Sequence, residues 1–118
     1  MAIDLKRAYD PPAKSDGRRI LVDRVWPRGI AKEDLQIDAW LKDLAPSTEL
    51  RKWFGHDPTK WDEFRKRYAR ELEQHADALE ELVEKARAGH VTLVFSAKDT
   101  ERNNAAALKE HLEHRLNA

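Results

Sequence analysis

The run Val91-Thr92-Leu93-Val94-Phe95 decides the fold class, because five consecutive strand-forming residues carry no charge. A half-exposed strand alternates polar and apolar residues, whereas an unbroken run of this kind is typical of a strand buried on both faces. Gly89 lies just before the run, and a polar turn over 96–101 follows it, so both ends are marked. We therefore expect this strand to lie at the centre of a sheet.

Two shorter runs near the N-terminus predict further strands over 3–7 and 19–25. The loop between them, residues 10–17, contains two prolines and a glycine. It is too short for an ordinary helical crossover between neighbouring parallel strands. The sequence therefore leaves open whether these two strands run parallel or antiparallel.

Helices are predicted for most of the remaining chain, because apolar residues recur there at spacings of three and four. They are expected over 32–44, between Ser47 and Gly55, over 58–88 as one helix or two broken near His75, and after Asn103 or Asn104 as N-cap. Their large aromatic residues are expected to form one layer against the sheet: Trp40, Trp53, Trp61, Phe64 and Tyr68. This pattern predicts a small α/β fold of two or three layers, with a short, mostly parallel sheet packed by helices.

Length and composition narrow the class of protein. The chain has 118 residues, so we expect a single domain over 1–118. It has no cysteine, which excludes disulfides, a thiolate nucleophile and cysteine-ligated metal sites. No apolar run reaches the roughly 18 residues that span a bilayer, and residues 1–10 do not resemble a signal peptide. We therefore expect a cytoplasmic protein without a membrane partner.

Charge is balanced overall, with 22 basic and 22 acidic residues. A general nucleic-acid-binding domain is usually clearly basic, so we do not expect general nucleic-acid binding. Residues 1–30 nevertheless hold seven basic and four acidic side chains. This local excess is compatible with a basic pocket.

The side chains that follow the predicted strands define a candidate site, because ligands of α/β sheets bind beyond the carboxyl ends of the strands. These are Arg7 after the first strand, Arg24, Trp26 and Arg28 after the second, and Ser96 and Asp99 after the third. Arginine presents a planar fork of donors that matches phosphate and carboxylate groups, and it stacks on rings such as Trp26. Arg51, on the predicted short helix, could extend the same anion site.

Each of these residues also has a structural interpretation. Arg24 and Arg28 could form internal salt bridges while Trp26 fills the core. His56 could act as a general acid or base, or make a hydrogen bond within an interhelical loop. Asp99 could serve as a base, or as a turn former or helix N-cap. We expect no metal site and no cofactor.

Several motifs resemble those of the bacterial YeaO-like family, a group whose domain has no known function. They lie over 16–29, 45–47, 50–54, 56–58 and 68–72, with Phe64, the strand 91–95, Asp99 and Asn104. The resemblance covers essentially the whole chain in the right order. It implies an α/β fold with a short parallel sheet, and it brings no established activity.

Two functions fit these observations. The first is a small-molecule site for a phosphate- or carboxylate-bearing ligand, built on Arg24 and Arg28. The second is a non-catalytic module that binds protein or nucleic acid through an arginine and tryptophan face. A concave pocket holding Arg24, Arg28 and Asp99 would favour the first, and a flat patch with Trp26 exposed would favour the second. The sequence leaves open whether the protein is an enzyme and what its oligomeric state is.

Overall fold

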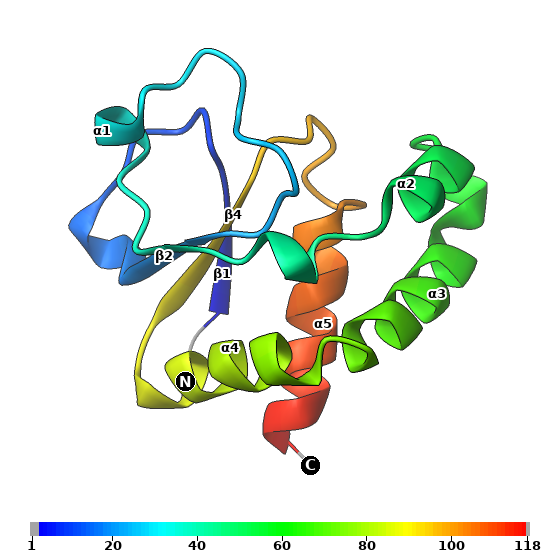
Figure 1. Ribbon diagram of the computed structural model, residues 1–118. Coiled ribbons are helices and arrows are strands. Elements are labelled where there is room, and N and C mark those ends of the chain that lie inside the picture. Colours follow the sequence, from blue (N-terminus) through cyan, green and yellow to red (C-terminus); the bar gives the residue numbers. More distant parts are fainter. Residues whose placement is uncertain (1–2, 118) are drawn as a thin grey trace.

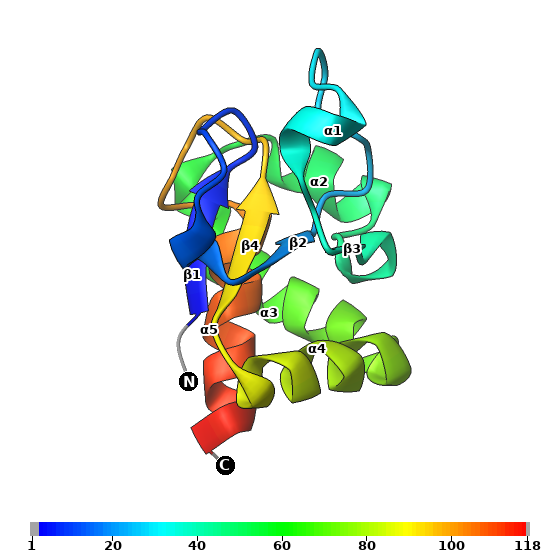
Figure 2. The same cartoon turned by 90° about the vertical axis from the view of Figure 1, so that its left-hand side faces the viewer.

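A computed structural model describes residues 3–117, and these residues form a parallel sheet in the order β1-β4-β2-β3. The strands are β1 (Ile3–Arg7), β2 (Arg18–Leu21), β3 (Ala39–Trp40) and β4 (Val91–Phe95). β4 pairs with β1 on one side and β2 on the other, as Figure 2 shows. All five residues of β4 are buried. The predicted central strand is confirmed.

The helices of this part of the chain are arranged around that sheet (Figure 1). They are α1 (Lys32–Leu35), α2 (Thr48–Phe54), α3 (Trp61–Glu73), α4 (Ala76–Ala88) and α5 (Asn104–Asn117), with single 3₁₀ turns η1 (Lys14–Asp16), η2 (Lys42–Leu44) and η3 (Pro58–Lys60). Ser47 caps α2 by accepting the Leu50 N–H, and Gly55 ends it with φ 55°. The region 58–88, for which the sequence allowed one helix or two, contains the two helices α3 and α4 with a break at Gln74–His75. None of the helices over 3–117 is long and apolar enough to cross a membrane.

The two faces of the sheet support cores of different size. Val91, Leu93 and Phe95 of β4 belong to the larger core, which α2, α3, α4 and α5 cover. Val94 points the other way and joins a smaller core that includes Leu35 of α1. In Figure 1, α1 lies to the left of the sheet, and α2, α3 and α5 lie to its right. The expected α/β fold is confirmed, with one thick helical layer and one thin layer.

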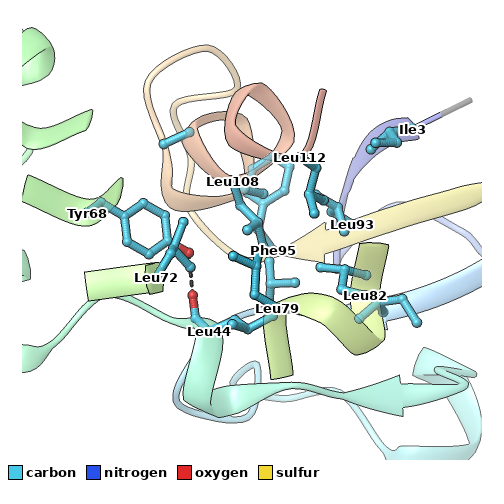
Figure 3. Close-up of a cluster of buried hydrophobic side chains, with 14 of the residues drawn as sticks. Ile3, Leu44, Tyr68, Leu72, Leu79, Leu82, Leu93, Phe95, Leu108 and Leu112 are labelled. Carbon is cyan, nitrogen blue, oxygen red and sulfur yellow. Dashed lines mark hydrogen bonds between the residues drawn. The ribbon is translucent and has the colours of Figure 1, made fainter. Parts of the chain in front are cut away.

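Tyr68 lies deep in the larger core, between α3 and the turn η2. Its ring is 1% exposed, and its hydroxyl donates a hydrogen bond to the carbonyl of Leu44 (Figure 3). Burial raises the pKa of Tyr68 far above its ordinary value, and the nearby carboxylates of Asp23 and Glu71 add to the effect. The Tyr68 hydroxyl therefore stays protonated, and its hydrogen bond to Leu44 holds the turn η2 against α3.

The prediction of one helix over 32–44 is wrong. α1 ends after one turn, at Gln36, whose backbone is left-handed with φ 52°. The chain then pairs with β2, where the Asp38 N–H donates to the Arg19 carbonyl and the Leu41 N–H to the Leu21 carbonyl. These bonds use backbone groups that a helix would need. The apolar spacing of the segment arises because successive residues face different cores.

Two related predictions also need correction. The second strand ends at Leu21, not at residue 25, although the Val22 N–H still donates to the Val94 carbonyl. Trp40 does not join the aromatic layer of the helices. It belongs to the smaller core and packs edge-on against Trp26, with ring centroids 5.5 Å apart. A strand residue at this position faces away from the helices, and a helical interpretation could not show that.

The structure settles the direction of the first two strands. β1 and β2 both run parallel to β4, which lies between them. The connection over 8–17 has ten residues, and a chain of that length can extend over roughly 33 Å. A strand of five residues is only about 17 Å long, so the loop can return along the sheet without a full helix.

A buried ion pair joins β2 to the turn before it. Asp16 and Arg19 are 7% and 3% exposed, and their side chains approach to 2.6 Å. Lys6 Nζ donates to Asp16 Oδ1 at 3.1 Å. Arg19 Nε and Nη2 both donate to the carbonyl of Leu35. The two buried charges are therefore paired and hydrogen-bonded, which is the condition for tolerating them away from water.

Gly17 marks a close approach between the connection and the start of β4. Its backbone has φ 65° and ψ −134°, a region that is essentially restricted to glycine. A Cβ on Gly17 would lie 2.5 Å from the His90 carbonyl oxygen. That same carbonyl accepts the Arg18 N–H, so it cannot move without loss of a sheet hydrogen bond.

We expect Gly17→Ala to lower the free energy of unfolding by about 3 kcal/mol, through backbone strain and steric overlap together. Gly89→Ala is the matched control, because the Gly89 backbone is extended and no atom lies within 4 Å of a Cβ there. Denaturant unfolding of both variants measures the difference. Equal stability of the two variants would contradict the role assigned to Gly17.

Candidate functional site

A cleft of about 440 Å³ lies at the carboxyl ends of β2 and β4. Three segments supply most of its lining: residues 23–28 after β2, residues 45–56 with α2, and residues 96–104 before α5. They meet because the sheet order places β2 beside β4. The cleft therefore lies where ligands bind in parallel α/β sheets.

Four arginines line this cleft, namely Arg24, Arg28, Arg51 and Arg102. None of them forms a salt bridge with any residue in 3–117. Arg28, Arg51 and Arg102 are exposed, whereas Arg24 is half-buried. Arg24 Nη2 donates to the Ala45 carbonyl at 3.3 Å, while its buried Nε has no acceptor within the described residues. The internal salt bridges that the sequence allowed do not form in this part of the chain.

Asp23 is the carboxylate in the lining, and its oxygens are already occupied. Oδ2 accepts the Ser96 N–H at 2.9 Å and the Ser96 hydroxyl at 2.6 Å. Oδ1 accepts Asn104 Nδ2 at 3.0 Å, and the same amide donates to the Val22 carbonyl. Asp23 therefore joins the end of β2 to the end of β4 and the start of α5. It fixes the geometry of the cleft, whose lining holds four arginines and this one carboxylate.

Trp26 is anchored rather than free. Its indole N–H donates to the Ile30 carbonyl at 2.7 Å, and its ring packs against Trp40. Trp26 is half-buried and lines the cleft. It thus forms part of a wall and not a flat, exposed patch.

Arg7 lies outside the cleft, and its guanidinium is committed to the chain after β4. Nε donates to the Ala97 carbonyl at 2.9 Å, and Nη2 donates to the Ser96 carbonyl at 3.3 Å. Its guanidinium also lies 5.1 Å from the centre of the Tyr9 ring. Arg7 therefore stabilises the backbone of Ser96 and Ala97, which line the cleft, from outside the cleft.

Asp99 also lies outside the cleft lining, on the turn before α5. Its Oδ1 accepts the N–H groups of Arg102 and Glu101 at 3.0 and 2.9 Å. These hydrogen bonds hold the pKa of Asp99 below its ordinary value, and the nearby charges of Arg102 and His56 act in the same direction. A carboxylate with a lowered pKa is a weak base near neutral pH. Its geometry is that of a turn former, while the Asn103 side chain caps α5 by accepting the Ala106 N–H.

His56 lines the cleft in an unusual backbone conformation. His56 has φ 57° and the preceding Gly55 has φ 55°, so two successive residues have left-handed backbone conformations. The side chain is exposed, and no residue in 3–117 forms a hydrogen bond with it. Its ring lies 6.3 Å from that of Phe54. The loop hydrogen bond that the sequence allowed for His56 is not formed there.

The structure thus brings together Arg24, Trp26, Arg28, Arg51, His56 and Ser96, and leaves Arg7 and Asp99 outside the lining. Sequence reasoning missed the roles of Asp23, Arg102 and Asn104. The signal for Asp23 and Asn104 was present, since Asp23 lies two residues after the end of a buried strand and Asn104 opens a helix. Arg102 had no such signal, because the shape of the turn decides where it points.

Comparison with known proteins places this chain in a family. The family model described as "Inactive DUF488-N3 subclade" matches residues 2–118. The chain belongs to this subclade. The chain is 48% identical over 112 residues to the uncharacterized protein YeaO of Escherichia coli strain K12. This match covers 95% of the chain and 97% of that protein. The YeaO-like resemblance of the sequence is confirmed.

Mycobacterial relatives show the same extent of similarity. The uncharacterized proteins Mb3100c of Mycobacterium bovis and Rv3073c of Mycobacterium tuberculosis are each 42% identical over 113 residues. In both comparisons the match covers 96% of this chain and 95% of the relative. No solved structure matches the chain. These relatives therefore match nearly the whole chain, and their names state no activity.

Proposed function

We propose that the protein binds a small phosphate- or carboxylate-bearing molecule in the cleft at the carboxyl edge of the sheet. Arg24 carries the proposal. Its half-buried guanidinium lines the cleft with one hydrogen bond, a buried Nε without an acceptor, and no acidic partner within residues 3–117. Partial removal of a cation from water is costly unless the cation is paired. An anion in the cleft would supply that pair.

The charge of the whole lining supports the same ligand class. Arg28, Arg51 and Arg102 add three exposed guanidinium groups, and the oxygens of Asp23 are held by Ser96 and Asn104. A concave site with a positive surplus attracts anions, and guanidinium forks bind phosphate and carboxylate oxygens in pairs. The start of the 14-residue α5 also borders the cleft, and its dipole favours negative charge.

Binding without turnover fits the site better than catalysis. The subclade itself is described as inactive. Asp99 lies outside the cleft lining and is held ionised by the turn around it. His56 has no partner among the described residues that would orient its ring, as a general base usually requires. These features support a ligand-binding role.

The alternative, a face that docks protein or nucleic acid, would require a flat patch with Trp26 on the surface. The cleft is concave, and Trp26 is half-buried against Trp40. The geometry therefore favours the small-molecule proposal over the docking face.

We expect phosphate or sulfate to raise the melting temperature of the protein, because a ligand at a hundredfold excess over its Kd stabilises the folded state by about 2.7 kcal/mol. Arg28→Ala should weaken anion binding about tenfold or more, the effect of losing one charged hydrogen bond. Its melting temperature without anion should stay unchanged, because Arg28 is exposed and forms no salt bridge within 3–117. Calorimetric titration and thermal melts measure the two effects.

Arg18→Ala is the control for a general loss of positive charge. Arg18 is also exposed, but it lies at the amino end of β2, at the opposite edge of the sheet from the cleft. It should bind anions like the parent protein. An equal loss in both variants, or no anion effect on the parent protein, would refute the proposed site.

A further inference from the structure

We infer that the ligand is an organic anion with an aromatic body, which inserts its ring into the cleft and leaves its charged group at the rim. The inference rests on the proposed function, since it assumes that an anion binds there. It goes further by assigning the part of the ligand that the cleft selects. The basis is a division of the lining into a buried apolar part and an exposed cationic part.

The buried part of the lining is mainly apolar; its polar member is Asn103, whose side chain already bonds the Asp99 carbonyl and the Ala106 N–H. Phe64, Phe54 and Ala45 are 2%, 7% and 5% exposed, and all three line the cleft. The rings of Phe54 and Phe64 are stacked, with centroids 4.5 Å apart. Residues that are both buried and part of the lining must form the floor. A floor of this composition offers ring faces and edges to a flat apolar group and no charge to an anion.

The cationic part of the lining lies at the rim. Arg28, Arg51 and Arg102 are exposed, and each comes from a different segment of the cleft wall. His56 lies with them on the exposed side. A charged group at the rim can therefore meet several guanidinium groups while it keeps part of its hydration. At the floor it would lose its water and meet mainly apolar side chains.

Arg24 lies between these two zones. It is half-buried, and its free Nε is fully shielded from solvent. A guanidinium at this depth can bind the inner oxygen of a phosphate or carboxylate whose outer oxygens reach the rim. The flat face of the guanidinium can also pack against the aromatic ring of the ligand. Arg24 thus fits the junction between body and charged group.

The size of the cleft agrees with such a ligand. Its volume of about 440 Å³ falls within the range of roughly 300–1,000 Å³ found for small-molecule sites. Inorganic phosphate alone would leave the apolar floor in contact with trapped water. A single ring that carries a phosphate or carboxylate group would cover it.

Three probes test this inference on the full chain: inorganic phosphate, phenyl phosphate and phenol, compared by calorimetric titration at one pH and one salt concentration. We expect phenyl phosphate to bind at least about tenfold more tightly than phosphate, because the ring leaves water. We expect phenol to bind at least about tenfold more weakly than phenyl phosphate, because it lacks the group that the arginines hold.

A floor-filling variant makes the test specific. Ala45→Val adds volume at the buried floor and leaves the carbonyl that Arg24 uses. It should lower the affinity for phenyl phosphate much more than the affinity for phosphate, and so abolish the preference between the two. Ala97→Leu, at a half-buried wall position, replaces it if Ala45→Val does not fold. Arg28→Ala should instead weaken both anions together.

The outcomes separate this inference from the proposed function. Equal affinity for phosphate and phenyl phosphate would overturn the aromatic body and leave the anion site standing. Retention of the full preference in the floor-filling variant would also overturn it, because the ring would then lie elsewhere. Failure of both anions to bind would refute the anion site itself. Binding of phenol as tightly as phenyl phosphate would overturn the inference, because the charged group would then add nothing to the binding of the ring.

Discussion

Phe64→Ala is expected to lower the free energy of unfolding by about 3–5 kcal/mol, the range for deletion of a large aromatic side chain from a core. The Phe64 ring is 2% exposed and contacts three other aromatic rings, those of Phe54, Trp61 and Tyr68. Its removal leaves a cavity between α2 and α3 that the rigid neighbouring rings cannot fill. Denaturant unfolding followed by tryptophan fluorescence measures the loss.

Phe64→Leu is the matched control, because it keeps most of the apolar volume. It should lose well under half of what Phe64→Ala loses. Trp61→Ala should also lose less than Phe64→Ala, since Trp61 is only half-buried. A loss below 1 kcal/mol in Phe64→Ala would show that this ring does not hold the helical layer together.

Asp16→Ala is expected to destabilise the protein by about 3–5 kcal/mol, because it leaves the 3%-exposed Arg19 without its counter-ion. Lys6 would lose its partner in the same step, at smaller cost, because it is only partly buried. Asp43→Ala is the control: Asp43 is exposed, and its removal should change stability by no more than about 0.5 kcal/mol. Parallel denaturant curves at neutral pH give both values.

The same ion pair predicts how this difference depends on pH. Burial raises the pKa of Asp16, but the hydrogen bonds from the Ala13 N–H, Lys6 and Arg19 outweigh it and hold the pKa below the ordinary 3.8. A lowered folded-state pKa gives stability that is present above the unfolded value and lost as the pH falls through the folded value. The gap between the parent protein and Asp16→Ala should therefore narrow below about pH 4. A gap that widens on acidification would contradict this assignment.

Much of the fold could be predicted because local chemistry determines it. The apolar run 91–95 demands burial on both faces, Ser47 and Gly55 mark the ends of α2, and the pattern over 58–88 allows a break near His75. β3 could not be predicted. It has two residues, and it exists only because β2 offers a free edge, so its determinant lies elsewhere in the chain.

The candidate site divides in the same way. Arg24, Arg28 and Ser96 could be placed together because the carboxyl ends of neighbouring parallel strands share one edge. Asp99 was assigned to the same edge, but its carboxylate is held by its own turn. Arg7 bonds to the carbonyls of Ser96 and Ala97 and so supports the wall from outside the cleft. Turn geometry and side-chain direction decide these cases, and neither has a pattern in the sequence.

The position of β4 has a consequence for how the chain acquires its structure during synthesis. β1 and β2 make their sheet contacts to β4, which is the last of the described strands to leave the ribosome. The helices α1 to α4 must therefore emerge before the two N-terminal strands can pair with it. Such long-range closures slow folding, and unpaired strand edges are prone to aggregate in the meantime. β4 is the template on which β1 and β2 assemble, so a nascent chain stalled before residue 91 would lack the strand that joins β1 to β2.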